Sequence, residues 1–379
     1  MKKVRFGIVG TGGMGQGHCS KMQDLDEVKL TCVCDIDEDK VKGVGKQYGV
    51  PHFLKHKDLL ESGLADAVIV ATPHYFHPPI AIDAFRKGIH VLSEKPIGVT
   101  VKAVDRMIKA AEKSGLIFSV MFQWRSEPSF QAAKRLIDAG RVGEIYRTEL
   151  MMGSFRSQAY YDSATWRATW RGEGGGVLLN QAPHIMDIFT WLAGVPKTVR
   201  GKVNTRRHEI EVEDEAYALL EYANGATGYI HCSVNEVPGT NRIEICGEKG
   251  KILLDGRKLS FHEVERGIQE YSDGTEKMWG SPEASKKRVP LKKQETGHAA
   301  IIRNTARAIL YGEELLSPGI EGIRSLELAN AMILSGNKGK IARIPLDRDE
   351  YEDLINQLKK KSKTKKRVRL QTVTDPQHK

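Results

Sequence analysis

The stretch VRFGIVGTGGMG (residues 4–15) decides the fold of the first part of the chain. Its apolar β-favouring run, Val4–Val9, leads directly into a GxGxxG pattern, and a helical segment follows from Met14 to about Met22. The first glycine allows a tight turn, the second lets backbone N–H groups approach a pyrophosphate, and the third allows close helix–strand packing. GxGxxG alone is a weak signal, so the residues that follow decide its interpretation.

An acidic residue follows the next strand. The apolar run Val28–Cys34 ends at Asp35, about 20 residues past the glycines, where a carboxylate can accept hydrogen bonds from an adenosine ribose. The alternative is that Asp35 caps the helix expected just after it. Its charge repels a 2′-phosphate, and no arginine follows immediately. The sequence therefore predicts NAD rather than NADP as the cofactor.

Strands and helices alternate through residues 1–123, which predicts a dinucleotide-binding domain of the α/β class, a Rossmann doubly wound parallel sheet. Buried strands are expected at 65–71, 89–92 and 116–121. In such sheets a ligand binds past the carboxyl ends of the strands. The polar clusters at these ends are Thr72-Pro73-His74, Glu94-Lys95-Pro96 and Gln123-Trp124-Arg125.

Residues 124–346 change to a helix followed by long alternating strands, which predicts an α+β substrate-binding domain with a large, mostly antiparallel open sheet. Residues 262–296 are expected to form a polar, basic loop region. The expected strands are 144–153, 198–206, 215–222, 227–234, 241–246 and 250–254.

The net charge of +10 is concentrated at the C-terminal end. From Lys359 onward nine basic residues accompany one acidic residue, Asp375, so this segment carries +8 and leaves +2 for the preceding residues. Residues 347–379 are therefore predicted to be a basic, disordered tail. A solvated charge run without a recognition motif predicts no specific nucleic-acid partner.

Other compositional features argue against a membrane or metal-binding class. No apolar run approaches the ~20 residues of a membrane-spanning helix. The five cysteines are odd in number and lack a CxxC spacing, which is typical of a reducing cytoplasm and argues against disulfides or zinc. His74 and His77 are three residues apart, but no third ligand lies near them in sequence, so no metal is expected.

A second glycine-rich stretch, GGGVLLNQAPHIMD (residues 174–187), is expected to enter a helix that ends at Gly194. At helical spacing Asn180, His184 and Asp187 share one face. An amide, an imidazole and a carboxylate on one stripe, reached through glycines, favour a small polar ligand pressed against the helix. The alternative is an amphipathic helix whose polar face meets water.

GTGGMG at 10–15, EKP at 94–96 and GGGVLLNQAPHIMD at 174–187 together resemble the motifs of the glucose-fructose oxidoreductase/inositol dehydrogenase/MocA (Gfo/Idh/MocA) family. The resemblance extends from residue 1 to about residue 346. It implies an NAD(P)-dependent dehydrogenase that transfers a hydride between nicotinamide C4 and a secondary alcohol or ketone of a sugar, sugar derivative or polyol. It also implies a homodimer or homotetramer, and a cis bond between Lys95 and Pro96.

The resemblance assigns catalytic roles to Lys95 and His184. Because Asn180 stands where many members have Asp, proton transfer is expected to fall to His184 with Lys95, while the Asn180 amide orients substrate. The expected substrate-binding residues are Asn180, Gln123, Arg125, Arg156, Tyr160 and Asp187. The expected cofactor-binding residues are Gly10, Thr11, Gly12, Gly13, Met14, Gly15, Asp35, Ala71, Thr72, Pro73, His74, His77, Glu94, Lys95, Pro96, Gln123, Trp166 and Arg167.

Two other functions are compatible with these motifs. One is an NAD-dependent glycoside hydrolase or lyase that oxidises its substrate transiently, eliminates, and reduces again. The other is a non-catalytic NAD(H)-sensing protein, against which the presence of both Lys95 and His184 argues. Net NADH formation distinguishes the dehydrogenase from both.

Overall fold

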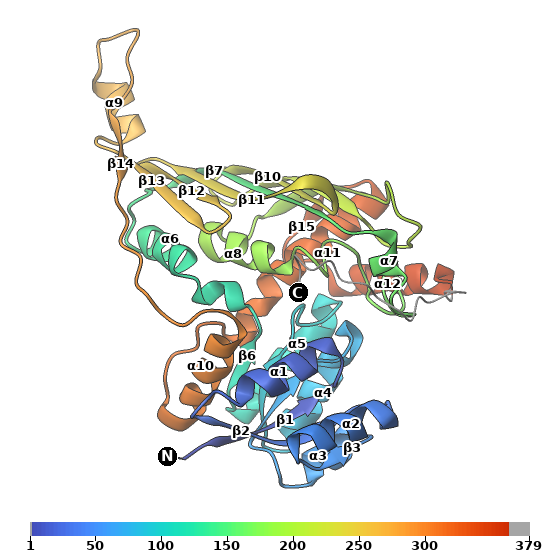
Figure 1. Cartoon of the computed structure of the whole chain (residues 1–379). Helices are drawn as coiled ribbons and strands as arrows, with labels where there is room; N and C mark the ends of the chain where they lie inside the picture. The colour runs from blue at the N-terminus through green and yellow to red at the C-terminus, as the bar shows by residue number, and fades with distance from the viewer. Residues whose placement is uncertain (1, 364–379) are drawn as a thin grey trace. The chain divides into compact units, whose positions relative to one another are not determined.

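The computed structural model describes residues 2–363 (Figure 1), and the chain divides into two compact units. Unit 1 contains Met1–Glu127 and Gln294–Leu326, and unit 2 contains Pro128–Lys293 and Glu327–Lys379. This division differs from the expected pair of continuous domains, because residues 294–326 return to the first unit. No membrane-spanning candidate, meaning a helix both long and apolar enough to cross a bilayer, occurs within residues 2–363.

Unit 1 is built on a six-stranded parallel sheet with the strand order β3-β2-β1-β4-β5-β6. This order confirms the predicted doubly wound Rossmann sheet. The strands are β1 (Val4–Val9), β2 (Val28–Cys34), β3 (His52–Phe53), β4 (Ala67–Val70), β5 (His90–Ser93) and β6 (Phe118–Val120). The helices are α1 (Gly13–Met22), α2 (Glu38–Tyr48), α3 (His56–Glu61), α4 (His77–Arg86), α5 (Val101–Ser114) and α10 (Gly297–Tyr311), with 3-10 turns η1 (His74–Phe76), η2 (Gln123–Ser126) and η3 (Gly319–Glu321).

Local capping signals account for the bounds of the surface helices in unit 1. Asp37 caps α2 by accepting a hydrogen bond from the backbone N–H of Lys40, and Thr100 caps α5 in the same way. Both helices end at a glycine in the left-handed region, Gly49 with φ 65° and Gly115 with φ 66°. These caps determine where each helix ends and where the polar loop to the neighbouring strand begins.

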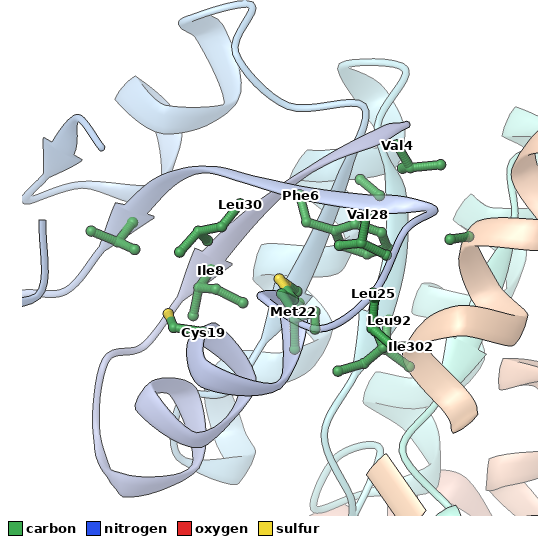
Figure 2. Close-up of a cluster of buried hydrophobic side chains, with 14 of the residues drawn as sticks. Val4, Phe6, Ile8, Cys19, Met22, Leu25, Val28, Leu30, Leu92 and Ile302 are labelled. Atoms are coloured by element: carbon green, nitrogen blue, oxygen red, sulfur yellow. The ribbon is translucent and has the colours of Figure 1, made fainter. Parts of the chain in front are cut away.

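The core of unit 1 explains why the late helix α10 belongs to it. Figure 2 shows buried apolar side chains from β1 and β2, among them Phe6 and Ile8, together with Met22 of α1. Ile301 and Ile302 of α10 belong to the same cluster and are fully buried. Burial of this apolar surface is the main driving force for docking α10 on the first 127 residues.

Unit 2 contains a nine-stranded sheet with the order β14-β13-β12-β11-β7-β10-β9-β8-β15. β7 and β10 pair in parallel, and every other neighbouring pair is antiparallel, which confirms the mostly antiparallel sheet. The strands are β7 (Ile145–Phe155), β8 (Thr198–Asn204), β9 (Glu215–Glu221), β10 (Thr227–Ser233), β11 (Asn235–Gly247), β12 (Gly250–Asp255), β13 (Lys258–Val264), β14 (Ala284–Lys287) and β15 (Ala342–Arg343). The helices are α6 (Pro128–Asp138), α7 (Gln158–Tyr161), α8 (Pro183–Ala193), α9 (Ile268–Gly274) and α12 (Arg348–Lys361), and α11 (Gly322–Lys338) spans the boundary between the units.

The region expected as a loop at 262–296 contains regular structure. β14 pairs antiparallel with β13, and α9 lies in the long connection between them, which projects from the sheet in Figure 1. All four residues of β14 are exposed, so the strand lacks the apolar alternation by which strands are identified.

The predicted disordered tail is also wrong in part, because residues 348–361 form α12. The Asp347 side chain caps this helix by accepting hydrogen bonds from the backbone N–H groups of Asp349 and Glu350. Tyr351, Leu354 and Ile355 are buried on one face. Their spacing is helical, but the surrounding charges obscure it in the sequence. The rest of the predicted tail, residues 364–379, lies outside the described residues.

Candidate active site

The glycine-rich loop after β1 leaves space for a ligand at the start of α1. A Cβ atom at Gly10, whose φ is 99°, would lie 2.6 Å from the carbonyl oxygen of Ala71, and one at Gly15 would lie 1.9 Å from that of Gly10. At Gly12 and Gly13, by contrast, an added Cβ would meet nothing within 4 Å. Bare backbone therefore borders open space at a helix N-terminus that no side chain caps, which suits a pyrophosphate.

Asp35 is attached to this loop. Its Oδ2 accepts hydrogen bonds from the backbone N–H of Thr11 at 2.7 Å and from the Thr11 hydroxyl at 3.1 Å. Its Oδ1 accepts from the backbone N–H of Asp37 at 3.1 Å. Asp37, not Asp35, caps α2, so the capping alternative for Asp35 is wrong. The carboxylate stands beside the glycine loop, as the cofactor interpretation requires.

His77 joins the ends of two neighbouring strands. Its Nδ1 lies 2.8 Å from the carbonyl oxygen of Pro96, and its Nε2 lies 2.6 Å from that of Thr72. Both ring nitrogens therefore face backbone acceptors rather than a metal position. Within residues 2–363, no group of three or more His, Cys, Asp or Glu is arranged to hold a metal ion.

Thr72, at the end of β4, presents a buried hydroxyl that meets no hydrogen-bond partner within residues 2–363. Ala71 and Pro73 flank it and are half-buried, and His74 is buried in η1. A buried hydroxyl without a protein partner next to the glycine loop is compatible with a ribose hydroxyl as its partner. Together with the open space at Gly12, it indicates that these residues fit a dinucleotide.

Glu94 is a buried carboxylate whose pKa is strongly perturbed. Its Oε1 lies 2.7 Å from His18 Nε2, and its Oε2 accepts a hydrogen bond from the backbone N–H of Lys95 at 3.1 Å. Burial opposes ionisation, but the His18 contact and the charges of Lys95 and His298 hold the pKa of Glu94 at about 2. The half-buried Lys95 therefore starts from a backbone anchored by a carboxylate, and its bond to Pro96 is cis.

The sequence interpretation missed His18 and His298. The two rings lie 5.5 Å apart between centroids, and burial lowers the pKa of His298 to about 4. His18 lies one turn beyond the glycine loop on α1, and its side chain is 1% exposed. Only the packing of α1 and α10 against the end of β5 brings these residues to Glu94, so no local pattern could have identified them.

The cluster at the end of β6 divides into two kinds of residue. Gln123 begins η2 and is half-buried, and its carbonyl oxygen accepts a hydrogen bond from the Ser126 hydroxyl at 2.6 Å. Arg125 is 1% exposed and forms an ion pair with Glu321 of η3. The guanidinium of Arg125 thus stabilises the packing of unit 1, which does not support its expected contact with substrate.

In unit 2 the second glycine-rich stretch folds differently from the expectation. α8 begins at Pro183, which suits the first turn of a helix, and Asn180 lies in the turn before it. Asn180 therefore does not share a helix face with His184 and Asp187. His184, the second residue of α8, is half-buried, whereas Asp187 is fully buried, which favours a structural role for this carboxylate.

Glu213 fixes the backbone of this stretch and was not anticipated. Its Oε1 accepts hydrogen bonds from the N–H groups of Gly176 at 2.8 Å and Leu178 at 3.1 Å. A Cβ at Gly176 would lie 1.8 Å from the Glu213 carbonyl oxygen, so only glycine fits. Burial raises the pKa of Glu213 to about 7, and the nearby charge of Glu173 adds to the effect.

A polar cluster of four residues, the Tyr160 cluster, lies before α8: Tyr160, Arg167, Glu173 and Asn180. The Tyr160 hydroxyl donates to Asn180 Oδ1 at 3.3 Å and accepts from Arg167 Nη1 at 2.5 Å. The Asn180 amide nitrogen donates to Glu173, and the Arg167 Nη1 lies 3.8 Å from the same carboxylate. Tyr160 and Asn180, two predicted substrate residues, are thus hydrogen-bonded in one cluster with Arg167, a predicted cofactor residue. Glu173, the fourth member, was not predicted.

Two more predicted residues flank the Tyr160 cluster. The guanidinium of Arg156 lies 5.4 Å from the centroid of the Tyr160 ring and donates to the Phe155 carbonyl oxygen at 2.7 Å. Arg167 lies 4.3 Å over the Tyr160 ring and 4.8 Å over that of Trp166. The aromatic rings and guanidinium groups form a preorganised polar and aromatic surface within unit 2.

Models of known protein families match the sequence in each of the two units. A family model described as "Oxidoreductase family, NAD-binding Rossmann fold" matches residues 4–122. A second model, described as the "GFO/IDH/MocA C-terminal domain", matches residues 130–253.

Among curated relatives, the D-apiose dehydrogenase of Paraburkholderia graminis is 22% identical over 352 residues, covering 91% of this chain and 90% of that protein. The myo-inositol 2-dehydrogenase of Thermotoga maritima is 27% identical over 264 residues, covering 66% of this chain and 75% of that protein. Among solved structures, the WlbA dehydrogenase of Bordetella pertussis in complex with NADH and UDP-GlcNAcA is 31% identical with a TM-score of 0.77, covering 91% of this chain and all of that one. The chain therefore belongs to the Gfo/Idh/MocA family of oxidoreductases, with an NAD-binding Rossmann domain.

Proposed function

We propose that this oxidoreductase transfers a hydride between nicotinamide C4 and a secondary alcohol or ketone of a sugar, sugar derivative or polyol. Bound NAD supplies the hydride acceptor, or NADH the donor. One observation carries the proposal: the Glu94 carboxylate accepts a hydrogen bond from the backbone N–H of Lys95 at the end of β5. This end of β5 lies at the same edge of the parallel sheet as the glycine loop and Asp35. The relatives named as apiose and inositol dehydrogenases support the substrate class.

Lys95 and His184 are the proposed catalytic residues. Oxidation of an alcohol carbon requires removal of the hydroxyl proton by a base with a pKa near neutrality, and a histidine side chain meets that requirement by type. An ammonium group such as that of Lys95 stabilises the negative charge that develops on the oxygen. His184 lies at the start of α8, whose regular backbone fixes the position of its side chain, and the residue is half-buried.

The proposed substrate-binding surface of unit 2 is the Tyr160 cluster with Arg156, and Gln123 is a proposed substrate-binding residue of unit 1. Hydroxyl, amide and guanidinium groups offer the donors and acceptors that a ring of hydroxyl groups needs, and the aromatic face of Tyr160 suits the apolar face of a sugar. Two guanidinium groups near one ring, those of Arg156 and Arg167, also suit a substrate that carries an acidic group. The WlbA complex with UDP-GlcNAcA makes acidic sugar derivatives members of the panel to be tested.

The remaining cofactor residues are proposed to act by position. Gly10, Gly12, Gly13, Met14 and Gly15 form the phosphate loop. The proposed ribose and nicotinamide-side residues are Thr11, Asp35, Ala71, Thr72, Pro73, His74, His77, Glu94, Pro96, Gln123, Trp166 and Arg167. The five buried free cysteines are compatible with a reducing cytoplasm, where we propose that the enzyme works.

A carbohydrate panel tests the proposal. Purified enzyme is incubated with NAD and with neutral sugars, polyols, sugar acids and nucleotide-linked sugar acids, and NADH is followed by its absorbance. The expected result is stoichiometric formation of NADH and ketone with at least one compound, abolished in Lys95→Met. Cleavage of a glycoside without net NADH, or no reaction with any compound by enzyme that binds NADH, would contradict it.

A further inference from the structure

We propose that Glu173 is a positioning residue of the substrate site, and that its contact with Asn180 is the reason this chain carries an amide rather than a carboxylate at position 180. The inference rests on the proposed function, because it assigns Asn180 to the substrate site. It goes beyond that function by locating the negative charge of the site at residue 173. Residue 173 immediately precedes the three glycines of the second motif.

The Glu173 carboxylate is buried, and both of its oxygens accept hydrogen bonds from other groups of the protein. The side chain is 1% exposed, and one oxygen accepts from the amide nitrogen of Asn180. The other oxygen accepts from the backbone N–H of Ala168 at 2.5 Å. Ala168 has a φ of 57°, the left-handed region that an alanine rarely adopts, so Glu173 stabilises an unfavourable turn directly after Arg167.

This carboxylate sets the direction of the whole chain of hydrogen bonds. An ionised carboxylate only accepts, so the Asn180 nitrogen must face Glu173 and its oxygen must face Tyr160. The Tyr160 hydroxyl then donates to Asn180 and accepts from Arg167. Donation therefore runs from Arg167 through Tyr160 and Asn180 to Glu173, and a substrate meets an amide of fixed orientation.

An aspartate at position 180 is incompatible with this arrangement. It would place a second carboxylate against the buried oxygen of Glu173, with Glu213 close enough to feel the charge of Glu173. Two carboxylates that share a buried site cannot both ionise easily, so one must retain a proton. The Tyr160 hydroxyl would keep an acceptor, but the donor to Glu173 would be lost as soon as this proton dissociates.

Four variants test the inference: Asn180→Asp, Glu173→Gln, the double variant with both changes, and Glu211→Gln. The control Glu211→Gln removes a carboxylate that also supports the 166–173 loop, by accepting from the Trp170 N–H at 3.2 Å. Its other hydrogen bonds come from Ser362 and Lys363 rather than from the Tyr160 cluster. Kinetics are measured with the hit from the carbohydrate panel across about pH 6 to pH 9.

We expect Asn180→Asp to lose roughly 100-fold in kcat/KM at neutral pH, with the loss growing as pH rises. Glu173→Gln should lose roughly tenfold, and the double variant should regain at least about tenfold over Asn180→Asp because the carboxylate pair is gone. The control should remain within about threefold of wild type. Losses that simply multiply in the double variant would overturn the inference.

Thermal unfolding gives a readout that needs no substrate. In Asn180→Asp one carboxyl has a folded-state pKa above its unfolded value, so its contribution to stability is complete at low pH and lost as pH rises through the folded pKa. The Tm of Asn180→Asp should therefore fall relative to wild type between about pH 5 and pH 8, and the double variant should abolish this fall. A Tm difference independent of pH would refute the role of Glu173. If Tm shows the expected pH dependence but the protein is inactive on the whole panel, only the proposed function is refuted.

Discussion

At the scale of single residues, Glu94 interacts both with the buried His18 and His298 and with Lys95. Its pKa of about 2 lies below its ordinary value of 4.5, although the side chain is buried. A group with a depressed folded-state pKa contributes stability that is present above the unfolded pKa and lost as pH falls through the folded one. The contact with His18 is therefore expected to support both stability at mildly acidic pH and the position of Lys95.

We predict that His18→Ala raises the pKa of Glu94 and moves the acid unfolding of the protein to higher pH. It should also lower kcat/KM by roughly 10- to 100-fold, because the backbone of Lys95 loses its anchored neighbour. Thermal unfolding from about pH 3 to pH 7 and steady-state kinetics measure these effects. The control is His56→Ala, which removes a partly exposed histidine paired with Asp83. An acid transition equal in His18→Ala and the control would contradict the prediction.

Glu213 gives a pH dependence of the opposite sign. Its folded-state pKa of about 7 exceeds the ordinary value of 4.5, so its contribution to stability is complete below the unfolded pKa and lost as pH rises through about 7. We predict that the Tm of wild type falls between about pH 5 and pH 8.5, and that Glu213→Gln flattens this dependence. Glu215→Gln, which alters a neighbouring carboxylate bonded to Arg206, should retain the wild-type slope. Identical slopes in all three proteins would contradict the assignment.

The sequence predicted the candidate site residues that stand in motifs and missed the residues that contact them from distant parts of the chain. Lys95, Asn180 and His184 were accessible because each lies in a recognisable stretch. His18 is 76 positions from Glu94, and the residues joined by Glu213 are 35 to 37 positions away from it. A buried polar contact at such a separation depends on tertiary packing, which leaves no local pattern in the chain.

At the scale of elements, the glycine-rich motifs act by excluding side chains where backbones meet. The strands of unit 1 were predictable because each is a short apolar run bounded by polar residues. β14, α9 and α12 were not, since polar or charged residues dominate them and conceal the periodicity. The start of α8 was misplaced because the turn before it has helix-like hydrogen bonds, such as that from the Asn180 N–H to the Gly176 carbonyl oxygen.

α12 should contribute measurably to the stability of unit 2. Leu354 is buried, and Arg171 Nε donates to the Lys359 carbonyl oxygen near the end of the helix. We predict that Leu354→Ala lowers the free energy of unfolding by about 2–4 kcal/mol, because it leaves a cavity. Asn356→Ala, at an exposed position of the same helix, should change it by less than about 0.5 kcal/mol. Chemical denaturation measures both, and equal effects would show that the α12 face is not packed in solution.

At the scale of the whole molecule, four consecutive segments of the chain alternate between the two units. The second sheet exposes apolar side chains on β9, with Tyr217 41% and Leu219 59% exposed. Exposed apolar residues on a wide sheet favour association with a second copy. The return of residues 294–326 to unit 1 was not predictable, because their apolar helix face carries no information about which core it joins.

We predict a homodimer or homotetramer in solution, and dissociation or a marked weakening of it in Leu219→Glu. Light scattering coupled to size-exclusion chromatography measures the mass of each species. Ile36→Glu is the matched control, since Ile36 is a 93% exposed apolar residue in unit 1. A monomeric wild type, or equal dissociation by both variants, would contradict an interface on this sheet.

The proposed reaction is hydride transfer to NAD from a carbon of a carbohydrate. The most direct measurement uses the hit of the panel deuterated at its secondary carbon, with mass spectrometry of the nucleotide formed. We predict NADH that carries one deuterium, in amounts equal to the ketone produced. Unlabelled nucleotide with the deuterium retained in a cleaved or unchanged sugar would contradict it.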